Sequence, residues 1–162
     1  MKKLSLLALL ACVFFAFAGC KKSSPTVNAT GTLTATIGGT SQTFNLGAIA
    51  NLQKAGDSYT LGIIGVQSST VSNSLIITII NPSTITAGTY TGVGSVAQMS
   101  YTLASGSIYQ NSDDGQSSAT VVIKSISSTT VQGTFSGTLE LVNGGGPATE
   151  TVTNGTFNLS IK

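Results

Sequence analysis

Few side chains in this 162-residue sequence could carry out acid–base or nucleophilic chemistry. Charged residues make up 7% of the chain, against about 25% in an average globular protein. The sequence contains no histidine, and its seven basic residues are all lysines, so arginine is absent as well. These absences exclude histidine-based triads, the usual zinc motifs and bidentate phosphate clamps. We therefore expect no catalytic residue, no metal site and no cofactor.

Five carboxylates are the candidates for catalysis or metal binding. Asp113 and Asp114 lie in a stretch that superficially resembles a calcium loop, but Val121 occupies the position that needs a bidentate glutamate. Glu140 is placed outward on a predicted strand, where it could form a surface ion pair with Lys124 across the sheet. The two acids of a glycoside hydrolase would have to come from this small set. We expect a solvated turn at the two aspartates, and no enzyme.

Cys20 is the residue with the clearest chemical role. Two lysines precede an apolar run over residues 4–17, which is typical of an export signal. The run leads into Phe17-Ala18-Gly19-Cys20, which resembles the lipobox of bacterial lipoproteins, although Phe17 stands where leucine is usual. The resemblance implies signal cleavage after Gly19 and acylation of Cys20. The alternatives are cleavage after Ala18 and a membrane helix that is never cleaved.

The same resemblance predicts the organisation and location of the chain. Residues 1–19 are the expected signal peptide, residues 20–28 the lipidated cysteine with a flexible tether, and residues 29–162 the folded domain. Lys21-Lys22-Ser23-Ser24 lacks the aspartate of an inner-membrane retention signal, so we expect anchoring in the bacterial outer membrane. It also lacks a surface-export pattern, which favours the periplasmic face over the cell surface. With four lysines placed around the signal, no basic patch is left for nucleic acid.

Residues 29–162 predict an all-β domain. They show no sustained 3.6-residue periodicity, and the β-branched residues Thr, Val and Ile dominate. Strand signals alternate with turn signals at short spacing. We expect a single domain of about nine strands in an antiparallel β-sandwich or a flattened barrel, with hydroxyl groups in the solvent positions that charges usually occupy.

Several segments give specific predictions. Residues 31–37 should pair with residues 40–46 through a Gly38-Gly39 turn, with Phe44 and Leu46 facing inward. Residues 75–80 carry apolar side chains at both odd and even positions, which point to opposite faces of a strand. This pattern predicts a central strand covered on both faces.

Three further segments are less regular. Residues 48–54 could form a helical turn or part of a hairpin, and residues 105–117 are expected to form the longest polar loop. Asn154-Gly155 indicates a bulge or kink in the last strand.

A Gly-Thr-aromatic motif recurs at residues 88–90, 133–135 and 155–157. The structural explanation is a ring that packs at a strand entry over backbone without a side chain, and the alternative is a recognition role. Together with the hairpin sequence of residues 35–44, these motifs resemble small Bacteroidota lipoproteins of unknown function. The resemblance covers most of the mature chain and implies an all-β, lipid-anchored domain with no established catalytic residues.

Two non-enzymatic functions stay open for such a domain. The first is an interaction module that binds an envelope protein or a glycan. The second is a barrel that carries a small apolar ligand. A hydrolase acting on envelope glycans comes third. We favour the interaction module, because a strand that is apolar on both faces suits a covered sandwich layer better than a barrel wall.

Overall fold

The computed structural model describes residues 31–68, 70, 72–92, 97–111 and 117–162. Within these ranges the chain forms eleven strands and no helix, so the all-β prediction is confirmed. The strands are β1 (Thr32–Ile37), β2 (Thr40–Thr43), β3 (Leu46–Ala55), β4 (Ser58–Val66), β5 (Ser74–Asn81), β6 (Gly88–Gly92), β7 (Ala97–Thr102), β8 (Ile108–Gln110), β9 (Ser118–Ile126), β10 (Thr130–Asn143) and β11 (Thr149–Ser160).

Nine of these strands follow one another in a single antiparallel sheet, in the order β2-β1-β11-β10-β8-β7-β5-β4-β3. The long strand β10 is the branch point, because its first half pairs with β9 and its last residues pair with β8. Strand β6 then pairs with the free side of β9. The sheet curls into a half-barrel, as the prediction of a sandwich or flattened barrel requires.

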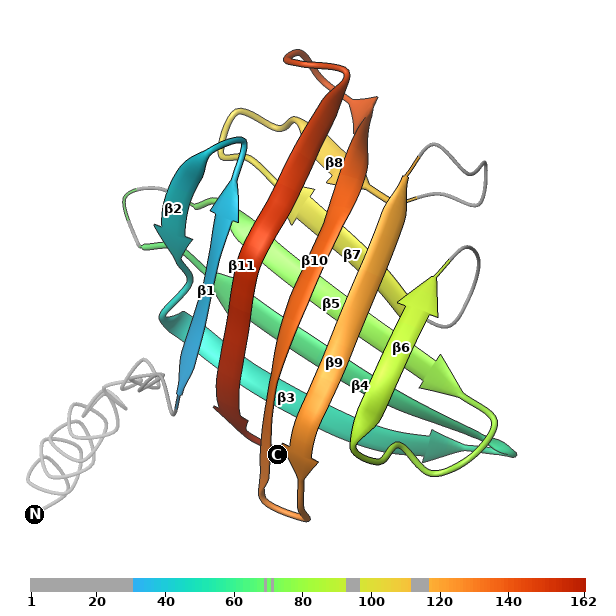
Figure 1. Ribbon diagram of the computed structural model, residues 1–162. Helices are drawn as coiled ribbons and strands as arrows, with labels where there is room; N and C mark the ends of the chain where they lie inside the picture. Colours follow the sequence, from blue (N-terminus) through green and yellow to red (C-terminus); the bar gives the residue numbers. More distant parts are fainter. Residues whose placement is uncertain (1–30, 69, 71, 93–96, 112–116) are drawn as a thin grey trace, which may run out of the picture.

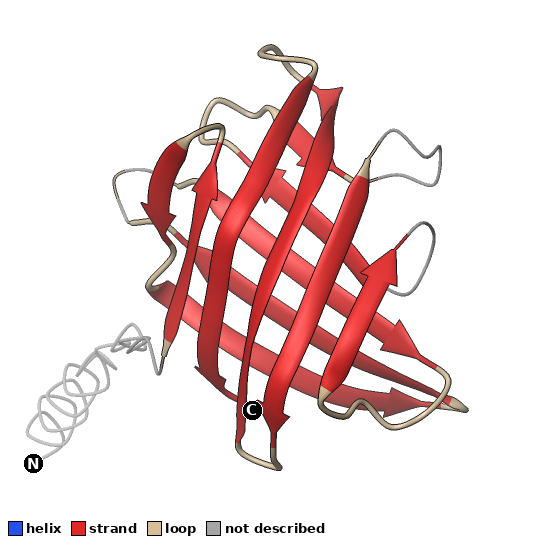
Figure 2. Cartoon of the chain, viewed as in Figure 1, coloured by secondary structure: helices blue, strands red, loops and turns tan. Residues whose placement is uncertain are grey.

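The curled sheet has two layers that pack face to face (Figures 1 and 2). The front layer contains β2, β1, β11, β10, β9 and β6, and the back layer contains β8, β7, β5, β4 and β3. The layers are continuous through the β10–β8 pairing. On the other side, Ile161 forms a parallel bridge with Ala50, and the Lys162 amide donates to the Ala50 carbonyl at 3.0 Å.

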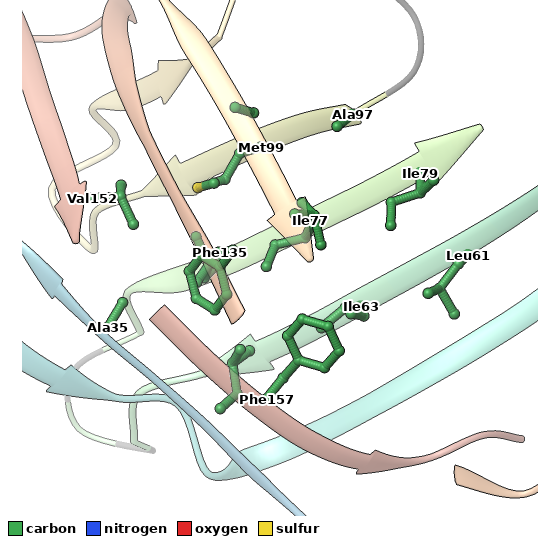
Figure 3. Close-up of a cluster of buried hydrophobic side chains, with 14 of the residues drawn as sticks. Ala35, Leu61, Ile63, Ile77, Ile79, Ala97, Met99, Phe135, Val152 and Phe157 are labelled. Carbon is green, nitrogen blue, oxygen red and sulfur yellow. The ribbon is translucent and has the colours of Figure 1, made fainter. Parts of the chain in front are cut away.

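Alternating side chains from both layers fill the space between them (Figure 3). From the front layer come Ala35, Phe135, Val152 and Phe157, which face a set of aliphatic residues on the back layer: Leu61, Ile63, Ile77, Ile79, Ala97 and Met99. All ten side chains are buried. The core is therefore made by period-2 alternation on strands that each cover one side of it.

The predicted β1–β2 hairpin is confirmed, with one correction. Gly38 and Gly39 have φ values of 56° and 80°, which a two-residue hairpin turn requires. Phe44 is fully buried, as predicted. Leu46 was predicted to face inward, but it is 43% exposed, because β2 ends at Thr43 and the chain turns into β3 before Leu46.

Residues 48–54 lie in β3, which pairs with β4, so the hairpin is confirmed over the helical turn. The central position of β5 between β4 and β7 is also confirmed. Its coverage on both faces was wrong: Ile77 is fully buried, whereas Ile76 is 39% exposed. The reason is that the two layers of the curled sheet cover only the face of β5 that points to the core, and the other face is open to solvent.

Two copies of the Gly-Thr-aromatic motif pair with each other. Gly133 lies opposite Phe157 and Phe135 lies opposite Gly155 in the β10–β11 register, and the two rings stack with centroids 6.4 Å apart. A Cβ on Gly133 would meet the Phe157 ring, and a Cβ on Gly155 would meet the Phe135 ring. The structural explanation is confirmed for these copies, although they lie in strand interiors and not at strand entries.

The third copy works differently. A Cβ on Gly88 would meet nothing within 4 Å, so no ring packs over that glycine. Instead, the Tyr90 hydroxyl donates to the Thr86 carbonyl and accepts from the Thr86 amide, both at 2.9 Å. Tyr90 therefore fixes the turn that leads into β6.

The bulge predicted at Asn154-Gly155 is present. Two steps along β1 (Thr34 to Thr36) match three steps along β11 (Thr156 to Thr153), which leaves an extra residue on β11. Asn154 has a φ of 52°, a left-handed conformation that asparagine tolerates better than most residues. The bulge shifts the alternation, so that Val152 and Gly155 both face the core.

Candidate functional site

The two residues of the predicted lipidation site, Gly19 and Cys20, lie outside the described residues, as do Asp113 and Asp114. The structure therefore bears on the remaining acids: Asp57, Glu140 and Glu150. Among the described residues, no group of three potential metal ligands comes together. The described residues also contain no helix with the length and apolar character needed to cross a bilayer.

The two glutamates lie on neighbouring strands but face opposite sides of the sheet. Glu150 lies opposite the buried Leu139, so it points toward the interior at one end of the half-barrel. Glu140 lies opposite Thr149 and Gln110, both exposed, so it points outward as predicted. This arrangement cannot place both carboxylates on one substrate.

The cross-sheet ion pair between Lys124 and Glu140 was a wrong prediction. In the β9–β10 register, Lys124 stands level with Gln132 and Gly133. Glu140 lies eight residues beyond Gln132 along β10, which corresponds to about 26 Å of extended strand.

A buried cluster of tyrosines and amides lies at the end of the half-barrel that contains Glu150. The Tyr101 hydroxyl donates to Gln42 Oε1 at 3.0 Å and accepts from Asn73 Nδ2 at 3.2 Å. Asn73 also accepts from the Ala104 amide through Oδ1 at 2.8 Å, which joins the β4–β5 and β7–β8 connections. Burial raises the pKa of Tyr101, and the charge of Glu150 adds to the rise.

Tyr109 belongs to the same cluster, with its ring centroid 6.4 Å from that of Tyr101. Its side chain is fully buried, and its hydroxyl has no hydrogen-bond partner among the described residues. Burial raises the pKa of Tyr109 as well, again with help from Glu150. In both tyrosines, the raised pKa favours the protonated hydroxyl.

Three open hollows lie on the outer faces of the two layers. One, of about 400 Å³, lies over the bulge on the front layer and is lined by threonines and serine around Gly155. The other two lie on the back layer. A hollow of about 310 Å³ is lined by Ile76, Thr78, Gln98, Met99, Ser100, Gln110 and Asn111, and one of about 210 Å³ is lined by Asn51, Gln53, Thr60 and Gly62.

The strand register joins the two back-layer hollows. Asn51 lies opposite Gly62, Gly62 opposite Thr78, and Thr78 opposite Gln98, so these four residues form one row across β3, β4, β5 and β7. Gly62 belongs to one hollow and Thr78 to the other, and they are direct cross-strand partners. We call this row with the side chains that flank it the amide channel.

The amide channel has two flanking rows. On one side, Ile49, Ile64 and Ile76 are successive cross-strand partners, followed by Ser100 and Gln110. On the other side stand Gln53, Thr60 and Ile80. Such a surface can offer hydrogen-bond donors and acceptors next to aliphatic walls, but it contains no group that could transfer a proton near neutral pH.

The sequence did not single out these residues, and Ile76 was predicted to be covered. Their convergence follows from the pairing of strands whose order in the sheet differs from their order along the chain. No signal in the sequence marks the channel. Comparison with protein-family models, curated proteins and solved structures finds no match for this chain.

Proposed function

We propose that this protein is a lipid-anchored component of the bacterial cell envelope that acts as a non-catalytic binding module. The observation that carries the proposal is the amide channel, an open and polar surface with no acid–base pair nearby. Acylation of Cys20 would hold the domain at the outer membrane, with the periplasmic face favoured. The tether of residues 20–28 would keep it within roughly 20 Å of the lipid headgroups.

The alternatives gain less support. A carrier of a small apolar ligand needs an internal cavity, whereas side chains such as Phe135, Ile77 and Met99 occupy the space between the layers. A hydrolase acting on envelope glycans needs two acids that share one face. Glu140 and Glu150 lie on opposite faces.

Anchoring is tested by metabolic labelling of the full-length chain with a palmitate analogue in a diderm bacterium. We expect label in the wild-type protein and none in Cys20→Ala, which should also lose membrane retention. Membrane retention of unlabelled wild-type protein would contradict the assignment.

Binding is tested in the same cells with a photo-cross-linking amino acid at Gln98, in the channel, or at Thr134, on the outer face of the front layer. We expect adducts with an envelope component from position 98 and not from position 134. Equal adduct formation at both positions, or none at either, would contradict a binding role for the channel.

A further inference from the structure

The shape of the amide channel suits an extended chain that crosses the strands. The row from Asn51 to Gln98 spans three inter-strand steps, or about 14 Å at the usual strand spacing. Gly62 lowers the middle of this row, because it has no side chain and a Cβ built there would meet nothing within 4 Å. The floor is therefore continuous over a length that accommodates several linked units of a polymer.

The chemistry of the channel is that of a neutral polyhydroxylated ligand. The exposed amides of Asn51, Gln53, Gln98 and Gln110 each combine donor N–H groups with an acceptor oxygen. A sugar hydroxyl is likewise both donor and acceptor, so one amide can accept a hydrogen bond from it or donate one to it. Ile64 and Ile76, exposed by 42% and 39%, offer aliphatic surface to the C–H face of a sugar ring.

Among the residues that the structure describes, charge on this face is nearly absent. The floor of the channel and its edge carry no charge, since they consist of Asn51, Thr60, Gly62, Thr78 and Gln98. The nearest charged residue in the strand register is Glu140, which lies one strand beyond Gln110. Lys54 lies at the end of β3, where its ammonium group is 5.3 Å from the centre of the Tyr59 ring. Nothing in the channel would attract a phosphate or a uronic acid.

A protein partner suits the channel less well. Protein interfaces depend on anchors that are rich in aromatic residues and arginine, and the described residues of the channel include neither. A partner strand would add to a sheet edge through its backbone, whereas the channel crosses the face of the sheet.

We infer that the amide channel binds a single strand of an uncharged polysaccharide, laid across β3, β4, β5 and β7. This inference rests on the proposed binding function and specifies its ligand class. Hydrogen bonds from the channel amides would hold the hydroxyl groups, and the isoleucine row would exclude water from one side of the sugar rings.

The test measures retardation of the full-length protein, purified in detergent, in gels that contain a soluble polysaccharide. The neutral probes are mixed-linkage β-glucan, galactomannan and dextran, and the charged probe is polygalacturonate. We expect at least one neutral probe to retard the wild-type protein, and polygalacturonate to have no effect.

Gly62→Val fills the channel floor while adding a β-branched residue that strands favour. We expect it to weaken binding at least tenfold, whereas the matched variant Thr134→Val on the front layer should bind like wild type. Thermal melting confirms that both are folded; if Gly62→Val is not, Asn51→Ala and Gln98→Ala replace it. Retardation by polygalacturonate, or unchanged binding in the channel variants, would overturn the inference.

The outcome also separates ligand class from binding role. If no neutral probe binds, yet cross-linking through position 98 captures a protein, the channel is a binding site and the polysaccharide assignment is wrong. If neither probe nor cross-linked partner is found, the inference and the proposed function fail together.

Discussion

Gly133 and Gly62 both lie in strand interiors, but their surroundings differ. A Cβ on Gly133 would collide with the Val122 carbonyl and the Phe157 ring, whereas a Cβ on Gly62 would meet nothing. We predict that Gly133→Ala lowers the free energy of unfolding by about 1–3 kcal/mol or more, through overpacking. Gly62→Ala should raise it by up to about 1 kcal/mol, because it restricts the unfolded chain.

Chemical denaturation of the two alanine variants measures this difference. Equal effects at both positions would contradict the reciprocal packing of rings over glycines in the β10–β11 pair.

The two buried tyrosines make a second matched pair. Tyr109→Phe removes a hydroxyl that has no partner among the described residues, so we predict unchanged or slightly greater stability. Tyr101→Phe leaves Gln42 without its donor and Asn73 without one acceptor, which should cost about 1–2 kcal/mol. Denaturation at neutral pH compares them, and a larger loss from Tyr109→Phe would contradict the hydrogen-bond assignment.

Both tyrosines also predict a pH dependence. Burial raises the pKa of Tyr101 and of Tyr109 in the folded state, whereas the unfolded chain has the ordinary tyrosine pKa near 10. The folded protein therefore retains protons that the unfolded chain loses, so stability is constant below that pH and falls as pH rises above it. Melting temperatures measured from neutral to alkaline pH should fall less steeply in the double phenylalanine variant than in wild type.

One side chain, that of Asn111, forms hydrogen bonds with the backbone along part of the edge of strand β7. Its last residues pair with β8, but Ala97 and Met99 lie beyond that short strand. There the Asn111 side chain accepts from the Met99 amide and donates to the Ala97 carbonyl, which replaces a missing strand. We predict that Asn111→Ala lowers stability by about 1–3 kcal/mol, since two backbone groups lose their partners.

Gln110→Ala is the control for this edge, because Gln110 is exposed and its side chain donates to the Ser100 hydroxyl at 3.3 Å and not to the backbone of β7 among the described residues. Its melting temperature should stay close to that of wild type. Equal losses from both variants would show that Asn111 does not support β7.

How far the sequence predicts each element depends on the length of its alternation. Strands such as β1 and β10 alternate over many residues, with buried positions such as Leu33 and Phe135, and both lie in segments where the sequence predicted strands. Strand β8 lies inside the segment predicted as the longest polar loop, although its Tyr109 is fully buried. Three residues are too few to show a period, so only the tertiary contacts reveal this strand.

The candidate site could not be predicted from the sequence for a related reason. Its residues Asn51, Gly62, Thr78 and Gln98 are spread over nearly fifty positions, and only the register brings them into one row. The outward isoleucines of β5 were instead attributed to burial under a second layer, since hydropathy does not distinguish an exposed apolar wall from a covered one.

The whole molecule depends on contacts between distant parts of the chain. The Thr34 and Thr156 hydroxyls, 122 positions apart, lie 2.8 Å from each other across the β1–β11 pair. We predict folding in the range of about milliseconds to seconds, as for other proteins dominated by non-local strand pairing. Stopped-flow refolding measures this rate, and folding within microseconds would contradict the topology.

The β1–β11 pairing also has a consequence for biosynthesis. The partner of β1 is translated more than a hundred codons after β1 itself, so the front layer cannot be completed before β11 has been made. Until then the emerging chain exposes the edge of β1 that β11 later covers.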